Sequence, residues 1–96
     1  MNRNAFVEQM QFYMPESACA IAYDWIQFNP VLIKITKPRK TKLGDYRPKG
    51  KDGKAIMTVN GNLNEYSFLI TFTHEIAHHI DYLERKTLQN THGQNW

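Results

Sequence analysis

The sequence predicts a single α+β domain, in which two N-terminal helices precede a small, mostly antiparallel sheet packed against one long helix. Apolar residues recur at helical spacing across residues 4–29 and again across 65–85. Between these segments lie two short runs rich in β-branched residues, which are typical of strands. With 96 residues, of which 42% are apolar and 22% charged, the chain has room for one core and is expected to be ordered.

The N-terminal third is expected to form two helices. Residues 4–13 carry an apolar stripe, and Pro15 suits the first turn of the second helix because its missing N–H costs nothing there. This second helix should end at Asn29, since the residue before a proline disfavours helical geometry. Cys19 lies within it. As the only cysteine it cannot form an internal disulfide, and we expect it to be buried as a small apolar residue.

Strands are expected in the middle of the chain. Residues 31–36 and 55–60 are the two clear strands, and the polar stretch between them has room for one short edge strand at 42–47. The pair Asn60-Gly61 then marks a turn into the next element.

A long helix is expected from Glu65 to residue 84 or 85, with Asn64 as its N-cap. The face expected to pack on the sheet consists of Leu69, Phe72, Ile76, Ile80 and Leu83. Residues 86–90 are expected to form a loop that returns the chain toward this helix.

The side of the helix away from that apolar face carries His74 and His78, which form the pattern H-E-x-x-H with Glu75. One helical turn brings two such imidazoles together, so that both can bind one zinc ion at about 2.0–2.1 Å. Glu75 lies about 100° around the helix from His74. There a carboxylate can take a proton from water whose pKa the metal has lowered to about 7. The pattern predicts a zinc hydrolase with Glu75 as its general base and one Zn²⁺ as cofactor.

A catalytic zinc ion usually has three protein ligands, and His92 is the best candidate for the third. The expected loop would place it near the pair. His79 is expected either to support the ligands or to lie on the surface. Peptide hydrolysis also needs a second donor for the developing oxyanion, and the candidates are Tyr46, Tyr66, Tyr82 and His79.

Basic residues are concentrated in residues 34–54, although the net charge of the chain is only +3. Such a patch can attract phosphate groups. The candidate nucleic-acid contacts are Lys37, Arg39, Lys40, Lys42 and Arg47.

A cytoplasmic protein with no membrane partner is expected. The apolar runs are too short to cross a bilayer, and residues 1–14 lack the apolar region of a secretory signal. A single cysteine fits a reducing compartment.

Taken together, these features resemble the SprT-like zinc metallopeptidase family. The resemblance covers residues 31–96 well and the N-terminal helices more loosely. It rests on the segments TKLGDY at 41–46, IMTVN at 56–60, HEIAH at 74–78 and HGQNW at 92–96.

The resemblance implies a zincin-like α+β domain that cleaves proteins or peptides, with a DNA association in part of the family. It implies that Glu75 is the general base and that the zinc ligands are His74, His78 and His92. Many SprT-like proteins also carry a C-terminal zinc-binding segment. Residues 1–96 are therefore expected to form one domain that is either truncated at its C-terminus or lacks that segment.

Two other functions fit the same residues. The basic stretch fits a nucleic-acid-binding module whose zinc site is structural or inactive. The zinc pattern also fits a hydrolase that acts on phosphodiesters. A Glu75→Gln variant separates catalysis from binding, because only a hydrolase loses its function while it keeps its zinc.

Overall fold

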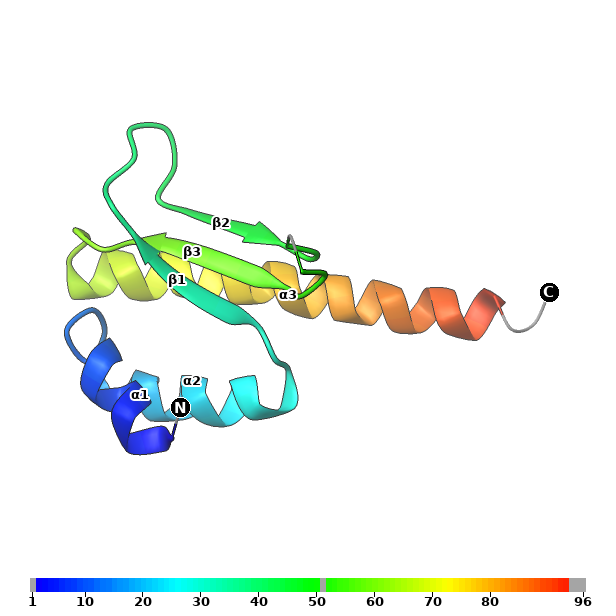
Figure 1. Cartoon of the computed structure of the whole chain (residues 1–96), viewed down its shortest axis with the longest axis horizontal. Helices are drawn as coiled ribbons and strands as arrows, with labels where there is room; N and C mark the ends of the chain where they lie inside the picture. The colour runs from blue at the N-terminus through cyan, green and yellow to red at the C-terminus, as the bar shows by residue number, and fades with distance from the viewer. Residues whose placement is uncertain (1, 51, 94–96) are drawn as a thin grey trace.

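The computed structural model describes residues 2–50 and 52–93, with side chains described through residue 88. It confirms the α+β fold, and the observed element bounds lie within about three residues of the predicted ones up to the start of the last helix. Figure 1 shows the elements, which are α1 (Arg3–Met10), α2 (Glu16–Phe28), β1 (Leu32–Thr36), β2 (Gly44–Arg47), β3 (Ile56–Asn60) and α3 (Glu65–Gly93).

Local capping chemistry sets two of the helix ends. The side-chain oxygen of Asn64 accepts a hydrogen bond of 2.9 Å from the main-chain N–H of Ser67, which makes Asn64 the N-cap of α3 as predicted. Asn29 leaves helical geometry, with φ −135° and ψ 70°, and so ends α2 just before Pro30. Both boundaries therefore follow from the residues at those positions.

The sheet is mixed, and the prediction of a mostly antiparallel sheet is wrong. β3 lies in the centre, paired in parallel with β1 and antiparallel with β2. The chain crosses from β1 to β2 and leaves a gap one strand wide, which β3 then fills. Because β1 and β2 run in opposite directions, β3 must be parallel to one of them. β2 is an edge strand, as predicted.

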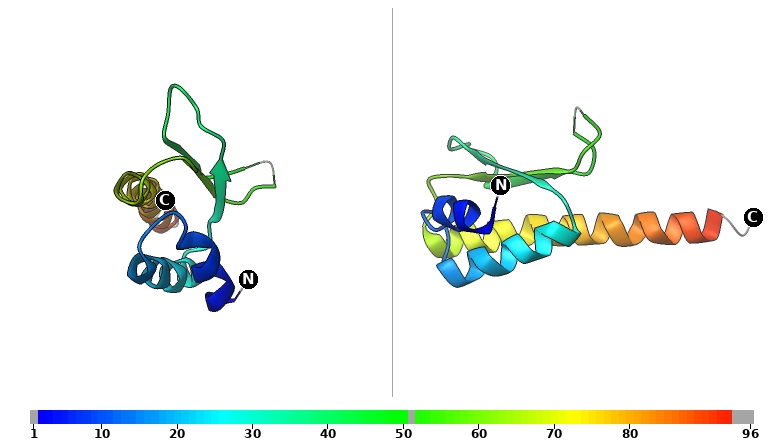
Figure 2. Two further views of the ribbon diagram at one scale, coloured as in Figure 1. Left: turned by 90° about the vertical axis from the view of Figure 1, so that its left-hand side faces the viewer. Right: turned by 60° about the horizontal axis from the view of Figure 1, so that its bottom comes forward.

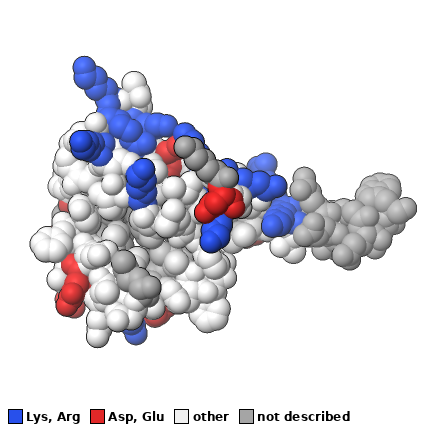
Figure 3. Space-filling view, in the orientation of Figure 1, with Lys and Arg blue, Asp and Glu red and all other residues white. Residues whose placement is uncertain are grey.

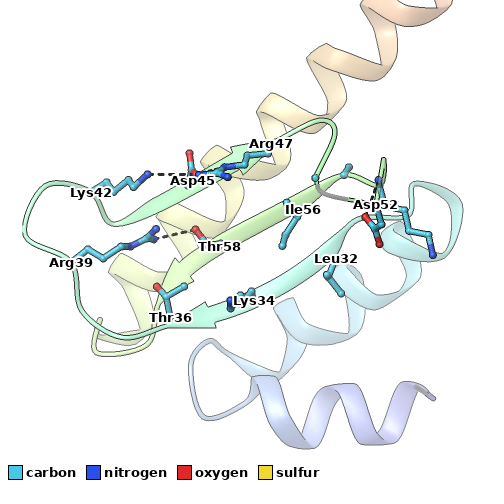
Figure 4. Close-up of a pocket in the computed structure, with 13 residues that line it drawn as sticks. Leu32, Lys34, Thr36, Arg39, Lys42, Asp45, Arg47, Asp52, Ile56 and Thr58 are labelled. Carbon is cyan, nitrogen blue, oxygen red and sulfur yellow. Dashed lines mark hydrogen bonds and ion pairs between the residues drawn. The ribbon is translucent and has the colours of Figure 1, made fainter.

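The helices cover one face of the sheet. Figure 2 shows α2 and α3 on the same side of the strands, and Figure 4 looks onto the opposite face with the helices behind it. The core lies between the sheet and the helices, and its buried apolar residues are Met10, Met14, Cys19, Ala22, Val31, Met57, Val59, Phe68 and Phe72. The burial of Cys19 is as predicted. Within the described part of the chain, no helix combines the length and the apolar character needed to cross a bilayer.

α3 turns a different face to the sheet from the one that its apolar spacing predicted. Among its described side chains, the buried ones are Phe68, Thr71, Phe72, Glu75 and His79. Of the five residues expected to pack on the sheet, only Phe72 is buried. It also lines an apolar groove shared with α2, together with the expected residues Leu69, Ile76 and Ile80. The sheet-facing side of α3 thus carries a hydroxyl, a carboxylate and an imidazole.

α3 continues to Gly93, so the loop expected at residues 86–90 is absent and that prediction is wrong. Figure 1 shows the helix running well past the sheet. An ion pair of 3.0 Å between Asp81 and Arg85, four residues apart, supports the helix beyond the sheet. A helix rises about 1.5 Å per residue, which puts the backbone of residue 92 about 21 Å along the axis from His78.

Candidate metal centre

His74 and His78 meet on the exposed side of α3, as their spacing predicted. Their Nε2 atoms are 3.1 Å apart, and their ring centroids are 4.7 Å apart with the ring planes at 89°. A tetrahedral zinc ion with Zn–N bonds of about 2.0–2.1 Å holds two nitrogens about 3.3 Å apart. The two imidazoles therefore already have nearly the spacing that one ion requires.

Glu75 joins this pair from the buried side of the helix. One ligand atom from each of His74, Glu75 and His78 lies within 4.8 Å of the others. The Glu75 side chain is only 5% exposed, whereas both histidines are exposed. Burial raises the pKa of the Glu75 carboxyl, and the two neighbouring histidines oppose this shift in part. A carboxyl with a raised pKa is better matched to proton transfer near neutral pH than an ordinary one.

The burial of Glu75 depends on Gly44 in the edge strand. A Cβ atom at residue 44 would lie 2.8 Å from Glu75 Oε2, 2.7 Å from Thr71 Cγ2 and 2.8 Å from the Thr58 carbonyl oxygen. Any larger residue would force β2 away from α3. Glycine at this position thus lets the strand lie directly over the carboxylate.

Tyr46, two residues along the same strand, points to the same face as Gly44 and lies against two histidines of α3. Its ring is nearly parallel to that of His78, at 8° with centroids 6.3 Å apart, and its hydroxyl hydrogen bonds to Nδ1 of His79. His79 is only 2% exposed, so it is a buried residue and not a surface one. Burial lowers the pKa of His79, and main-chain groups just after α2 oppose that shift.

The structure separates the four candidates for an oxyanion donor. Tyr46 and His79 lie together beside His78. Tyr66 is 76% exposed, and its backbone lies about 12 Å from that of His74 along the axis of α3. Tyr82 lies one turn beyond His78. Burial and, to a smaller extent, Tyr82 raise the pKa of Tyr46. Sequence spacing along the helix could not reveal the contribution of Tyr46, because it comes from β2.

The predicted third ligand, His92, lies in the last turns of α3, and its side chain falls outside the described residues. As one continuous helix, α3 carries the backbone of residue 92 away from His74 and His78. The expected geometry, in which a loop returns His92 to the pair, is therefore not the one observed. The assignment of His92 as a ligand stays a prediction.

The open face of the sheet carries most of the basic residues of the central stretch. It holds an open concavity of about 600 Å³, shown in Figure 4. The basic side chains that line it come from β1, β2 and the adjoining loops, and they are Lys34, Arg39, Lys42, Arg47 and Lys54. Three of the five predicted nucleic-acid contacts are among them. The other two, Lys37 and Lys40, are exposed in the segment between β1 and β2 and do not line the concavity.

Part of this basic surface is held by contacts within the protein. Arg39 donates hydrogen bonds of 2.9 Å to Asn60 Oδ1 and 3.1 Å to Thr58 Oγ1. Lys42 and Arg47 each pair with the carboxylate of Asp45, at 3.5 Å and 3.3 Å. Arg39 therefore has a fixed position, while Asp45 offsets part of the positive charge.

In the described part of the chain, only one set of three or more metal-binding side chains converges, and it is the H-E-x-x-H group. A single helix supplies all three of its members. The edge strand β2 covers its buried side through Gly44 and Tyr46. No protein-family model, curated protein or solved structure matches this chain.

Proposed function

We propose that this protein is a zinc-dependent peptidase that hydrolyses protein or peptide substrates with water, in the cytoplasm. The observation that carries the proposal is the pair of imidazole nitrogens 3.1 Å apart on His74 and His78, next to the buried carboxylate of Glu75. Imidazole nitrogens in this arrangement are preferred ligands of Zn²⁺. The lone, buried Cys19 supports a reducing compartment.

In this proposal the imidazoles hold the ion and Glu75 transfers the proton. Bound zinc supplies a Lewis acid that lowers the pKa of water to about 7. Glu75 takes a proton from the attacking water on its carboxylate and later gives it to the leaving amine. The carboxylate is ionised again at the end of the cycle, and the protein gains no net proton.

His92 belongs to the proposal as the third ligand. A continuous α3 would keep residue 92 about 21 Å from His78 along the axis, so the helix must end between them for the imidazole to reach the ion. We therefore propose that the last turns of α3 leave the helix when His92 binds metal. The ligand set would then be three histidines, with one position open for water.

The position of β2 favours a peptide substrate. β2 pairs with β3 on one side only, so its outer edge offers main-chain N–H and C=O groups to a further strand. An extended peptide can add to such an edge by main-chain hydrogen bonds. Gly44 and Tyr46 hold this strand over Glu75 and His78. A peptide bound along β2 would therefore pass beside the proposed centre.

The proposal is tested by offering the purified full chain, supplied with one equivalent of Zn²⁺, an unfolded protein and duplex DNA in parallel reactions. We expect cleavage of the protein and none of the DNA. His78→Ala should abolish the cleavage because it removes a ligand, whereas Lys86→Ala, an exposed change on the same helix, should leave it intact. Cleavage of DNA without cleavage of protein would instead favour phosphodiester hydrolysis.

A second candidate function is nucleic-acid binding on the open face of the sheet. Five basic side chains line its concavity, against the two carboxylates of Asp45 and Asp52. Figure 3 shows lysine and arginine gathered over this part of the surface. Among the described residues, no aromatic side chain lines the concavity, so these residues offer no platform for base stacking. Binding here would therefore rely on phosphate contacts.

Phosphate contacts predict a binding affinity that falls steeply with salt. A double variant, Lys34→Glu with Arg47→Glu, should weaken duplex DNA binding and reduce the slope of log affinity against log salt by about 2, roughly one unit for each cation removed. Lys86→Glu, which reverses one positive charge on α3 outside the concavity, should have little effect. Fluorescence anisotropy at several salt concentrations measures this, and equal affinities for the double variant and the control would contradict the second candidate.

A further inference from the structure

The proposed metal centre is supported by a side chain that lies outside the H-E-x-x-H helix. The ring of Tyr46 lies beside the His78 imidazole with a planar angle of 8°, and the Tyr46 hydroxyl reaches past it to Nδ1 of His79. Tyr46 therefore contacts a predicted metal ligand with its ring and a buried histidine with its hydroxyl. The two interactions fix both ends of the tyrosine side chain.

The hydrogen bond joins the Tyr46 hydroxyl to Nδ1 of His79, which is only 2% exposed. The other ring nitrogen of His79, Nε2, is buried and has no hydrogen-bond partner within the described residues. The contact with Tyr46 is therefore the hydrogen bond that orients the His79 ring within the described part of the chain, and it turns the Tyr46 hydroxyl into the protein interior.

His79 is itself held in place from a third element. The Trp25 ring of α2 meets the His79 ring edge to face, at 79° with centroids 5.8 Å apart. A continuous series of contacts thus runs from α2 through His79 to Tyr46 on β2, and from there to His78. It crosses the core and ends at a predicted ligand.

We propose that Tyr46, locked by its hydrogen bond to His79, is a positioning residue that fixes the orientation of the His78 imidazole for metal binding. The inference rests on the proposed function, because it assumes that His78 is a ligand. It removes Tyr46 from the candidates for the oxyanion donor, since its hydroxyl is already hydrogen bonded to His79. Groups that orient a metal ligand typically affect metal affinity by about 10–100-fold.

The test compares Zn²⁺ affinity, measured by competition with a chromophoric chelator, at a temperature where circular dichroism shows every variant to be folded. Tyr46→Leu, which removes the ring and the hydroxyl, should raise the Kd for Zn²⁺ by about 10–100-fold. Tyr46→Phe, which keeps the ring but frees it from His79, should raise it by a smaller factor. Tyr66→Leu is the matched control, because Tyr66 lies on α3 but is 76% exposed. The Kd of this variant for Zn²⁺ should equal that of the wild type.

A merely structural role would lower the stability of the Tyr46 variants and leave the Kd of the folded protein unchanged, and that result would overturn the inference. A Tyr46→Phe protein with unchanged Kd and a lower kcat would also overturn it, because Tyr46 would then act on the substrate. If Tyr46→Leu does not fold, the Kd of Tyr46→Phe decides alone.

A second measurement separates this inference from the proposed function, because it needs no metal. Long-range ¹H–¹⁵N correlation spectra of the metal-free proteins should show that the Nδ1 resonance of His79 shifts in Tyr46→Phe, which removes its hydrogen bond. The His78 ring protons should carry a ring-current shift that is lost in Tyr46→Leu. If the wild type binds no Zn²⁺, the proposed function fails, while these spectra still report whether Tyr46 holds His78. An Nδ1 resonance of His79 that is the same in the wild type and in Tyr46→Phe would contradict the hydrogen bond, and with it the inference.

Discussion

Replacing Gly44 with alanine will lower the free energy of unfolding by about 3 kcal/mol, at the upper end of the usual cost of overpacking. The added methyl group would lie 2.7 Å from Thr71 Cγ2 and 2.8 Å from the Thr58 carbonyl oxygen. That carbonyl belongs to the central strand β3, so it cannot move without disturbing the sheet. A small domain is stable by roughly 5–15 kcal/mol in total, so this loss is a large fraction. Equilibrium unfolding in urea measures the change.

Gly53→Asn is the matched control for this prediction. Gly53 has φ +81° and nothing within 4 Å of an added Cβ, and asparagine tolerates this backbone conformation better than most residues. We expect a cost below about 1 kcal/mol there. If Gly44→Ala were as mild as Gly53→Asn, the close approach of β2 to α3 would be refuted, and with it the account of how Glu75 is buried.

Glu75→Gln should reduce peptide hydrolysis by about 10²–10⁴-fold, the usual contribution of a general base, and should leave zinc binding intact. The amide has nearly the same shape as the carboxylate but cannot take a proton from water. Initial rates with an unfolded protein substrate measure the loss, and metal analysis of the same samples measures the retained zinc. Hydrolysis at the wild-type rate would show that Glu75 is not the base.

The same variant should be more stable than the wild type at neutral pH when both are metal-free. Burial raises the pKa of Glu75 in the folded protein above its ordinary value of 4.5, so folding disfavours the ionised form. A group with a raised pKa stabilises the fold only while it is protonated, and that contribution is lost as the pH rises through the folded pKa. Glutamine avoids the loss because it never ionises.

The stability gain of Glu75→Gln should therefore be largest at neutral pH and should shrink as the pH falls toward 4.5, the ordinary pKa of a glutamate. Thermal unfolding of both proteins in a chelator, across this pH range, measures the difference. A gain that is constant with pH would have to come from another source. A variant that is less stable at neutral pH would contradict the burial of an ionised carboxylate.

Features that depend on residues close together in the sequence could be predicted from the sequence alone. The N-cap at Asn64, the end of α2 before Pro30 and the strand around Met57 each follow from local propensity and spacing. The meeting of His74 and His78 is also local, because helix geometry alone brings residues four apart together. This much of the candidate centre could be read without a structure.

Features that depend on contacts between distant segments could not be read in this way. The order of the strands is set by a crossover and leaves no periodic signal, so the parallel pairing of β1 with β3 was missed. The burial of Glu75 and His79 results from the close approach of β2, which Gly44 permits. Hydrophobic spacing pointed to a different face of α3, because that face packs toward α2.

For the C-terminal part of α3 the prediction failed in the opposite way, because the local preference of its residues for helix was underestimated. Residues 86–90 were predicted to form a loop that returns the chain toward the pair, yet the residues after Tyr82 include strong helix formers, and Arg85 forms an ion pair with Asp81. The observed helix follows these local preferences. A bound metal would have to supply the energy to break it.

The central claim is that His74 and His78 bind one divalent ion beside Glu75, and elemental analysis of the purified full chain tests it most directly. The account predicts one zinc per chain in the wild type and in Glu75→Gln, a loss of zinc in His78→Ala, and weaker retention in His92→Ala. A wild-type protein that takes up no zinc, or a His78→Ala protein that retains it in full, would contradict the account.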